Sequence, residues 1–157
     1  MAIASTVIEY LEARGLRYRT VVHQPEPTSS QTAEAAHVPG DHLAKAVLVR
    51  SVSDHGDSYL VAVLPATQRL ELGTLRRRLG HMCALADRDA VRRWFPDCAE
   101  HAVPACAQAY GLPVLLDESL LEQDPVYLEV GDRARLIEMS GSEFRKLMRG
   151  SDAGLPE

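Results

Sequence analysis

Hydrophobic and polar positions follow two different periods along this chain, and each change of period marks the border of an expected element. Apolar residues spaced three or four positions apart predict helices, and alternating segments rich in β-branched residues predict strands. The predicted helices cover residues 5–14, 28–36, 70–79, 87–95 and 140–148, with a helical turn at 118–121. The predicted strands cover residues 18–22, 43–52, 59–64, 83–86, 112–116, 126–130 and 133–139.

Polar residues at capping positions predict where the helices begin. Residues 6–9 (TVIE) and 140–143 (SGSE) have the form of capping boxes. Thr28 or Ser30 can cap the short helix that ends near residue 36. Asp87 can cap the helix predicted at 87–95. The long segment 96–111 has no clean period, and a loop of this length in a compact domain is usually functional.

Turn-forming residues predict two hairpins. The first joins the strands 43–52 and 59–64 across residues 54–57, and the second turns at residues 131–132. Strand pairs separated by helices in irregular order indicate an α+β domain with a mixed sheet, because the regular alternation of a doubly wound fold is absent. We expect a single domain over residues 1–150, followed by a frayed tail at 151–157.

Composition and charge narrow the classes of function. The chain has 157 residues, is 46% hydrophobic and carries a formal net charge of −5, which argues against indiscriminate nucleic-acid binding. Six arginines between residues 76 and 93 could still meet a phosphate backbone locally, or form solvated helix faces. No apolar stretch of membrane-spanning length and no signal-peptide pattern occurs, so we expect a cytoplasmic protein without a membrane partner. Three cysteines in such a chain predict free thiols.

Lys45 is unusual because it is one of only two lysines among 17 basic residues and sits in the apolar run 43–49. A buried ammonium needs a partner, and it differs chemically from a guanidinium because it acts as a compact point charge. Either its stem packs while the ammonium reaches water, or the ammonium holds a substrate oxygen. In the second case Lys45 would face the helix start at 28–32 and the loop at 101–105.

Two other chemistries use the histidines and cysteines of the middle segment. A zinc site could draw on His81, Cys83, Cys98, His101 and Cys106, but their spacing matches no closed zinc pattern. A thiolate nucleophile at Cys98 or Cys106 would need His101 within hydrogen-bond reach and a third orienting group. The sequence favours neither, and we expect no metal.

Several segments together resemble the YbaK/ProX aminoacyl-tRNA editing domain family. They are the AEAA run at 33–36, the LAKAVLV run at 43–49, the YLVAVLP run at 59–65, the helix beginning near Leu70, the proline-containing loop at 101–107, the LPV run at 112–114 and the Met139-Ser140 start of the last helix. The resemblance covers nearly the whole chain. It implies a mixed, partly barrel-like sheet flanked by helices, and a freestanding deacylase that cleaves the ester of mischarged tRNA, with no cofactor.

The resemblance also implies the substrate, the partners and the site. The substrate would be the 3′ aminoacyl end of a tRNA such as that for proline, carrying a small or thiol-bearing amino acid, with an aminoacyl-tRNA synthetase as a further partner. The family lysine maps onto Lys45, which would orient the ester. The implied catalytic residues are Lys45, His101 and Ala102, and the implied substrate-binding residues are Thr28, Ser30, Lys45, Val47, Pro65, His101, Val103, Pro104 and Ala105.

The loop at 101–107 departs from the family pattern. Relatives usually have glycine at both ends of this loop and two prolines or Ser-Pro within it, whereas this chain has His101, Ala107 and the single Pro104. His101 could narrow the pocket, take over a polar role, or mark a paralogue that binds tRNA, a nucleotide or a protein without hydrolysis. The sequence leaves these alternatives open.

Overall fold

The computed structural model describes residues 3–151, and within them every predicted helix and strand is present, with borders shifted by up to three residues. The helices are α1 Ser5–Ala13, α2 Ser29–Ala36, α3 Leu72–Leu79, α4 Arg88–Trp94 and α5 Gly141–Leu147, and the 3-10 helices are η1 Gly40–His42, η2 Ala107–Tyr110 and η3 Glu118–Glu122. The strands are β1 Arg19–Val22, β2 Leu43–Ser53, β3 Gly56–Pro65, β4 Cys83–Leu85, β5 Val114–Leu116, β6 Val126–Glu129 and β7 Arg135–Met139.

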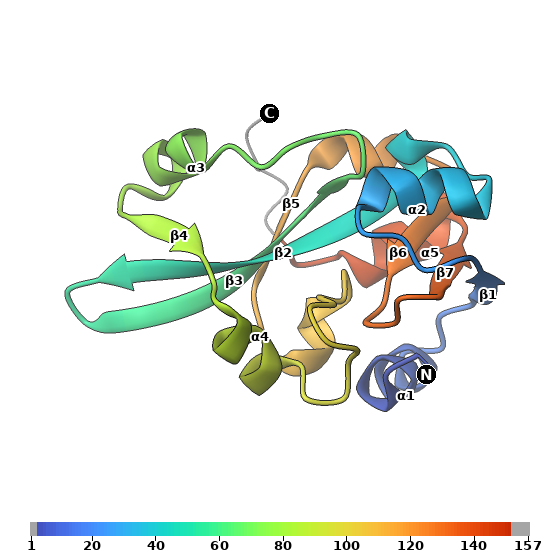
Figure 1. Ribbon diagram of the computed structural model, residues 1–157, viewed down its shortest axis with the longest axis horizontal. Helices are drawn as coiled ribbons and strands as arrows, with labels where there is room; N and C mark the ends of the chain where they lie inside the picture. Colours follow the sequence, from blue (N-terminus) through green and yellow to red (C-terminus); the bar gives the residue numbers. More distant parts are fainter. Residues whose placement is uncertain (1–2, 152–157) are drawn as a thin grey trace.

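The strands form one mixed sheet in the order β1-β7-β6-β2-β3-β5, and β4 pairs with β2 outside this path (Figure 1). The β2–β3 and β6–β7 pairs are antiparallel, which confirms both predicted hairpins, while β2–β6 and β3–β5 are parallel. The first hairpin turns within two residues, since Ser53 pairs with Gly56. The mixed sheet with flanking helices is thus confirmed, and the sheet is open between β1 and β5.

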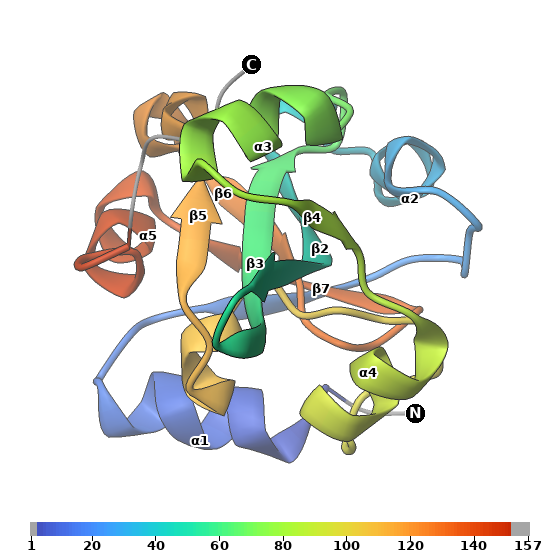
Figure 2. The same cartoon turned by 90° about the vertical axis from the view of Figure 1, so that its left-hand side faces the viewer.

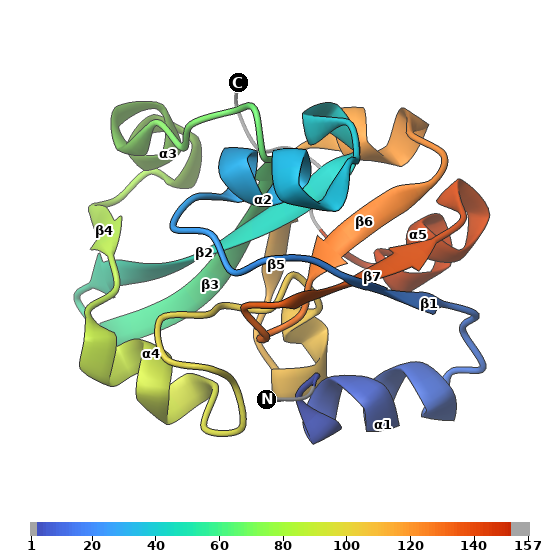
Figure 3. The ribbon, with the colours of Figure 1, turned by 45° about the vertical axis from the view of Figure 1, so that its right-hand side comes forward.

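Strand β2 carries the feature that positions the candidate site. One edge of β2 pairs with β3 along almost the whole length of the strand. Strands β6 and β4 therefore both pair with the other edge of β2. There β6 pairs with Leu43 and Ala44, and β4 pairs with Val49 to Ser51. Within the described residues, 45–47 therefore have no strand partner on this edge. Figure 3 shows β6 and β4 diverging on either side of this gap.

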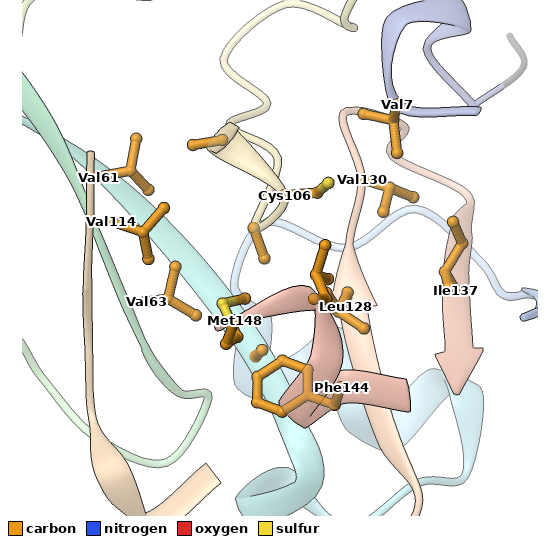
Figure 4. Packing of buried hydrophobic residues seen from close by; sticks show 14 of the residues in the cluster. Val7, Val61, Val63, Cys106, Val114, Leu128, Val130, Ile137, Phe144 and Met148 are labelled. Carbon is orange, nitrogen blue, oxygen red and sulfur yellow. The ribbon is translucent and has the colours of Figure 1, made fainter. Parts of the chain in front are cut away.

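Helices cover both faces of the sheet. On one face, α1, α4, α5, η2 and η3 enclose the largest hydrophobic core, in which Figure 4 shows Phe144 and Met148 packed close to Leu128. On the other face, α2 packs over Leu43 and α3 packs over Val49, in two smaller clusters. Figure 2 shows α1 and α3 on opposite sides of the sheet. Across the part of the chain that is described, no helix has the length and hydrophobicity needed to cross a bilayer.

The capping predictions are confirmed for three helices and wrong for one. The side chains of Thr28, Asp87 and Ser140 accept hydrogen bonds from backbone amides in the first turns of α2, α4 and α5. Helix α1 begins one residue before the predicted box, and its N-cap Ala4 makes no side-chain cap. The Thr6 amide donates instead to Asp97 Oδ2 at 2.9 Å, so a carboxylate from a distant loop replaces the local cap.

Gly131 allows the loop before η2 to lie directly against the turn between β6 and β7. Its φ is 79°, and an added Cβ would overlap the Cys98 side chain. The Ala99 amide donates to the Gly131 carbonyl at 2.7 Å, so the contact is held by the main chain. Close backbone approach of this kind needs a residue without a Cβ.

Gly131→Ala should therefore lower the free energy of unfolding more than Gly56→Ala. Both positions have positive φ, at 79° and 106°, but no atom lies within 4 Å of a Cβ added at Gly56. The extra loss at Gly131 should be roughly 1–3 kcal/mol, the usual cost of overpacking, when measured by urea unfolding. Equal losses in the two variants would contradict the proposed contact with Cys98.

Candidate functional site

A cavity of about 180 Å³ lies where β2 and β6 diverge, beneath the start of α2. It is smaller than the roughly 300–1,000 Å³ that drug-sized ligands occupy. The loop after α4 closes one side, and the turn between β6 and β7 closes another. The lining residues are His23, Glu26, Pro27, Thr28, Ser29, Thr32, Ala46, His101, Ala102, Val103, Glu129, Gly131, Asp132, Arg133 and Leu136.

Glu129 brings a carboxylate into this cavity from the last position of β6. Its neighbours Val126, Leu128 and Val130 face the large core, so strand alternation turns the Glu129 side chain to the α2 face. The Ser29 hydroxyl, in the first turn of α2, lies 3.0 Å and 3.1 Å from its two carboxylate oxygens. This contact joins α2 to β6 at the edge of the gap.

Burial raises the pKa of the Glu129 carboxyl to about 7. The Ser29 hydroxyl, the positive charge of Lys45 and the backbone amide of Ala46 act in the opposite direction. Desolvation raises the pKa of Glu129 more than these three interactions lower it, because the surrounding protein replaces most of the water that would stabilise the charged carboxylate. The carboxyl is thus near its titration midpoint at neutral pH.

Lys45 is half-buried on the same face of β2, between Leu43 under α2 and Val49 under α3. Burial lowers the pKa of its ammonium, the charge of Glu129 opposes this shift, and Arg69 adds to it. No ion pair within 4.0 Å joins Lys45 to a carboxylate of the described residues. The ammonium is therefore available to a ligand oxygen.

His23 places a second acceptor at the cavity. Its residue is only 7% exposed, and its Nε2 is a buried polar atom without a hydrogen-bond partner among the described residues. Its Nδ1 lies 2.7 Å from the carbonyl oxygen of Gln24. Because a carbonyl oxygen can only accept, Nδ1 carries the proton, and Nε2 of the neutral ring carries a lone pair.

The loop that contains His101 is held against β6 at both ends. The Ala99 amide donates to the Gly131 carbonyl, and the Ala105 amide donates to the Glu129 carbonyl, both at 2.7 Å. Between them His101 adopts a φ of 64°, the left-handed conformation that glycine reaches most easily. The loop thus has a backbone geometry that favours glycine at position 101 but carries an imidazole there, whose side chain is 44% exposed.

The structure brings together only some of the residues expected at the site. Thr28, His101, Ala102 and Val103 line the cavity, whereas Lys45 does not; its chain neighbour Ala46 lines the cavity, and the Lys45 charge acts on Glu129. The remaining expected residues lie outside the cavity lining and have structural contacts. Ser30 donates to the Ala66 carbonyl, Val47 packs near α3, Pro65 pairs with Ala44, and Pro104 and Ala105 are buried beside β6.

The cysteines do not form a nucleophilic or metal site in the described residues. Burial raises the pKa of Cys98 to about 11 and that of Cys106 to about 12. The Cys98 thiol lies 3.4 Å from the Tyr110 hydroxyl, and His81 contacts Ser51. No group of three or more His, Cys, Asp or Glu side chains in residues 3–151 could hold a metal ion.

The clustered arginines lie on α3 and α4, at the end of the molecule that carries the β2–β3 turn (Figure 1). Several already have partners. Arg76 donates to the Cys83 carbonyl, Arg77 donates to Thr74, and Arg92 lies 3.6 Å from Glu100. This surface is basic but partly neutralised.

Glu129, Ser29 and His23 belong to the site but were not among the residues expected from the sequence. A signal for Glu129 was present, since it is the one charged residue in the apolar run 126–130, just as Lys45 is in the run 43–49. Ser29 and His23 gave no such signal, because both lie in polar segments beside prolines. Their roles depend on contacts with strands about 100 residues further along the chain, such as the Ser29–Glu129 hydrogen bond.

The chain is similar to one protein family and to several solved structures. A family model described as "Aminoacyl-tRNA editing domain" matches residues 23–147. A comparison with curated proteins gives no match. Among solved structures, one from work on epitope backbone grafting onto scaffold proteins has 26% identity and a TM-score of 0.75, covering 97% of this chain and 95% of its own.

Two further solved structures share the fold over nearly their whole length. A proposed trans-editing enzyme for prolyl-tRNA synthetase has 24% identity and a TM-score of 0.75, and the match covers 99% of both chains. A hypothetical protein has 23% identity and a TM-score of 0.77, covering 94% of this chain and 97% of its own.

The raised pKa of Glu129 predicts how stability should depend on pH. Between about pH 7 and pH 4.3 the folded carboxyl is protonated while the unfolded one is ionised, so folding takes up a proton. The wild type should therefore gain roughly 1–3 kcal/mol of unfolding free energy relative to Glu129→Gln as the pH falls from about 8 to 5.

Glu138→Gln is the matched control for this experiment. Hydrogen bonds from Arg19 lower the pKa of Glu138. The contribution of Glu138 to the free energy of unfolding is therefore lost only when the pH falls below the pKa of the unfolded carboxyl. Denaturant unfolding at several pH values should then show little relative change for Glu138→Gln between about pH 8 and 5. A flat difference for Glu129→Gln over the same range would exclude the raised pKa.

Proposed function

This chain belongs to the aminoacyl-tRNA editing domain family, and on that premise we propose that it is a freestanding cytoplasmic trans-editing hydrolase that deacylates mischarged aminoacyl-tRNA. The observation that carries the proposal is the small cavity in which the start of α2 and the left-handed His101 loop meet beside Lys45. A synthetase rejects a smaller amino acid by only about 1–3 kcal/mol per methylene, so a separate hydrolytic site is needed for fidelity of translation.

The size of the cavity supports a small substrate group. About 180 Å³ accommodates a small or thiol-bearing aminoacyl group rather than a whole nucleoside. The tRNA for proline is the leading candidate, because a solved structure with the same fold is described as a proposed trans-editing enzyme for prolyl-tRNA synthetase. The terminal ribose and adenine would lie outside, toward Lys45.

The chemistry needs positioning more than a side-chain nucleophile. Water adds to the ester carbonyl, the new C–O bond forms, the bond to the ribose oxygen breaks, and the proton from water ends on that oxygen. Free amino acid and uncharged tRNA leave. Lys45 would hold a substrate oxygen as a point charge, and the backbone of the loop at 101–103 would place the ester and the water. The high thiol pKa values argue against thiolate attack.

Binding of the tRNA body would use a local surface of an acidic protein. The net charge of −5 disfavours broad association with RNA, whereas the arginines of α3 and α4 offer positive charge over a limited area. A synthetase partner could supply the remaining contacts.

The second candidate is a non-catalytic paralogue that binds tRNA, a nucleotide or a protein. The observation that favours it is the imidazole of His101, which lines the cavity at a position where the family resemblance implies glycine. An added side chain at that position can fill the space that an ester would need.

Deacylation of alanyl- and cysteinyl-tRNA for proline should be faster than spontaneous hydrolysis with the wild type and roughly 100-fold slower with Lys45→Ala, since misplacement of the ester by about 1 Å can cost this much. Lys45→Arg should also be impaired, because a guanidinium fork does not replace a point charge. Lys146→Ala, which alters the only other lysine, should retain the wild-type rate. Full activity in Lys45→Ala would remove Lys45 from the mechanism.

His101→Gly separates the two candidate functions. The variant keeps the left-handed backbone without an imidazole, so its stability should change by less than about 1 kcal/mol. An increase in deacylation would show that the imidazole narrows the site, and a decrease would show a polar role in the reaction. Tight tRNA binding with no hydrolysis in either protein would favour the paralogue.

A further inference from the structure

Glu129 has hydrogen-bonding capacity that the described protein atoms do not use. A carboxylate offers about four acceptor positions on two oxygens. The donors around it are the Ser29 hydroxyl, which lies between both oxygens, and the Ala46 amide. Glu129 lines the cavity, and at least one acceptor position of its carboxylate therefore remains for a ligand.

His23 independently indicates a ligand that donates hydrogen bonds. Its Nε2 is buried, has no hydrogen-bond partner among the described residues and belongs to a residue that lines the same cavity, and it is an acceptor when the ring is neutral. A buried polar atom without a partner costs roughly 1–3 kcal/mol, and structures seldom keep one without a reason. A donor on a bound molecule would remove this cost.

Asp132, which also lines the cavity, is already paired with a cation. The Asp132 carboxylate already accepts from the Ala134 amide and from Arg135, at 2.9 Å and 2.8 Å. Glu26 and Arg133 also line the cavity and carry opposite charges. Lys45 interacts with Glu129 electrostatically but forms no ion pair with it. The cavity thus combines an incompletely used carboxylate with a nearby ammonium.

An aminoacyl ester matches this arrangement. Its α-ammonium has three N–H donors, and its carbonyl oxygen lies two bonds away from the carbon that bears them. We propose that Glu129, oriented by Ser29, and His23 Nε2 form an acceptor subsite for the α-ammonium of the aminoacyl group. This subsite rests on the proposed deacylase function and deepens it.

The consequence is a substrate class defined by a free amino group. Acyl groups whose nitrogen is blocked, as in peptidyl-tRNA or N-formylated aminoacyl-tRNA, lose the positive charge and two of the three donors. They would leave the Glu129 carboxylate desolvated and unpaired, which is costly. The domain would therefore spare tRNAs that carry a growing chain or an initiator residue.

Two non-hydrolysable probes test the subsite directly. They are 3′-alanylamino-3′-deoxyadenosine and its N-acetyl derivative, and their dissociation constants can be measured by calorimetry. The wild type should bind the free-amine probe roughly 10- to 100-fold more tightly, as expected for a charge-assisted hydrogen bond. Glu129→Gln should reduce this ratio to below about threefold, and Ser29→Ala and His23→Phe should reduce it in part.

Glu122→Gln is the matched control, because Glu122 is an exposed residue of η3 that does not line the cavity. It should keep the wild-type ratio, and thermal unfolding should confirm that each variant is folded. Equal affinity of the wild type for the two probes, no binding of the free-amine probe, or an unchanged ratio in Glu129→Gln would overturn the subsite.

The deacylation assay distinguishes the failure of this inference from that of the proposed function. If alanyl-tRNA is hydrolysed but the two probes bind equally, the deacylase stands and the subsite fails. If the probes are discriminated and no mischarged tRNA is hydrolysed, the subsite stands as part of a binding protein.

Discussion

The gap in strand pairing on one edge of β2 is the constraint on which the site depends. Backbone amides of an inner strand need partners, and over residues 45–47 neither β6 nor β4 provides them. The Glu129 carboxylate reaches the Ala46 amide from β6 and also accepts from Ser29 of α2. Its main-chain carbonyl accepts from Ala105 and so holds the His101 loop. One residue thereby fixes three elements around the cavity.

This arrangement leaves charge unneutralised inside the fold. Desolvation acts on both Glu129 and Lys45, raising the pKa of the first and lowering that of the second, and each charge only partly offsets the shift of the other. Replacing buried charged groups by well-packed apolar residues is often neutral or stabilising. Proteins that retain such groups usually do so at sites where a ligand completes the interaction.

The fold could be predicted largely from local patterns, because its helices and strands have strong periods and most have capping or turn residues. The cap of α1 at Thr6 could not be predicted in this way, because the Asp97 carboxylate that accepts from the Thr6 amide lies 91 residues further along the chain. Lys45 could be singled out as a lone charge in an apolar strand. Glu129 has the same signature, but its significance comes from contacts with Ser29 and Ala46, which only strand order brings together. The left-handed backbone of His101 is likewise absent from the sequence pattern.

The contact between Cys98 and Gly131 has a practical consequence. A thiol with a pKa of about 11, shielded by the turn between β6 and β7, reacts slowly with alkylating reagents at neutral pH. Cys98 is half-buried in the folded chain, and separation of the loop from the sheet would expose it further, so its alkylation rate should rise with local opening. The chain carries a native chemical probe of loop motion, positioned three residues before His101.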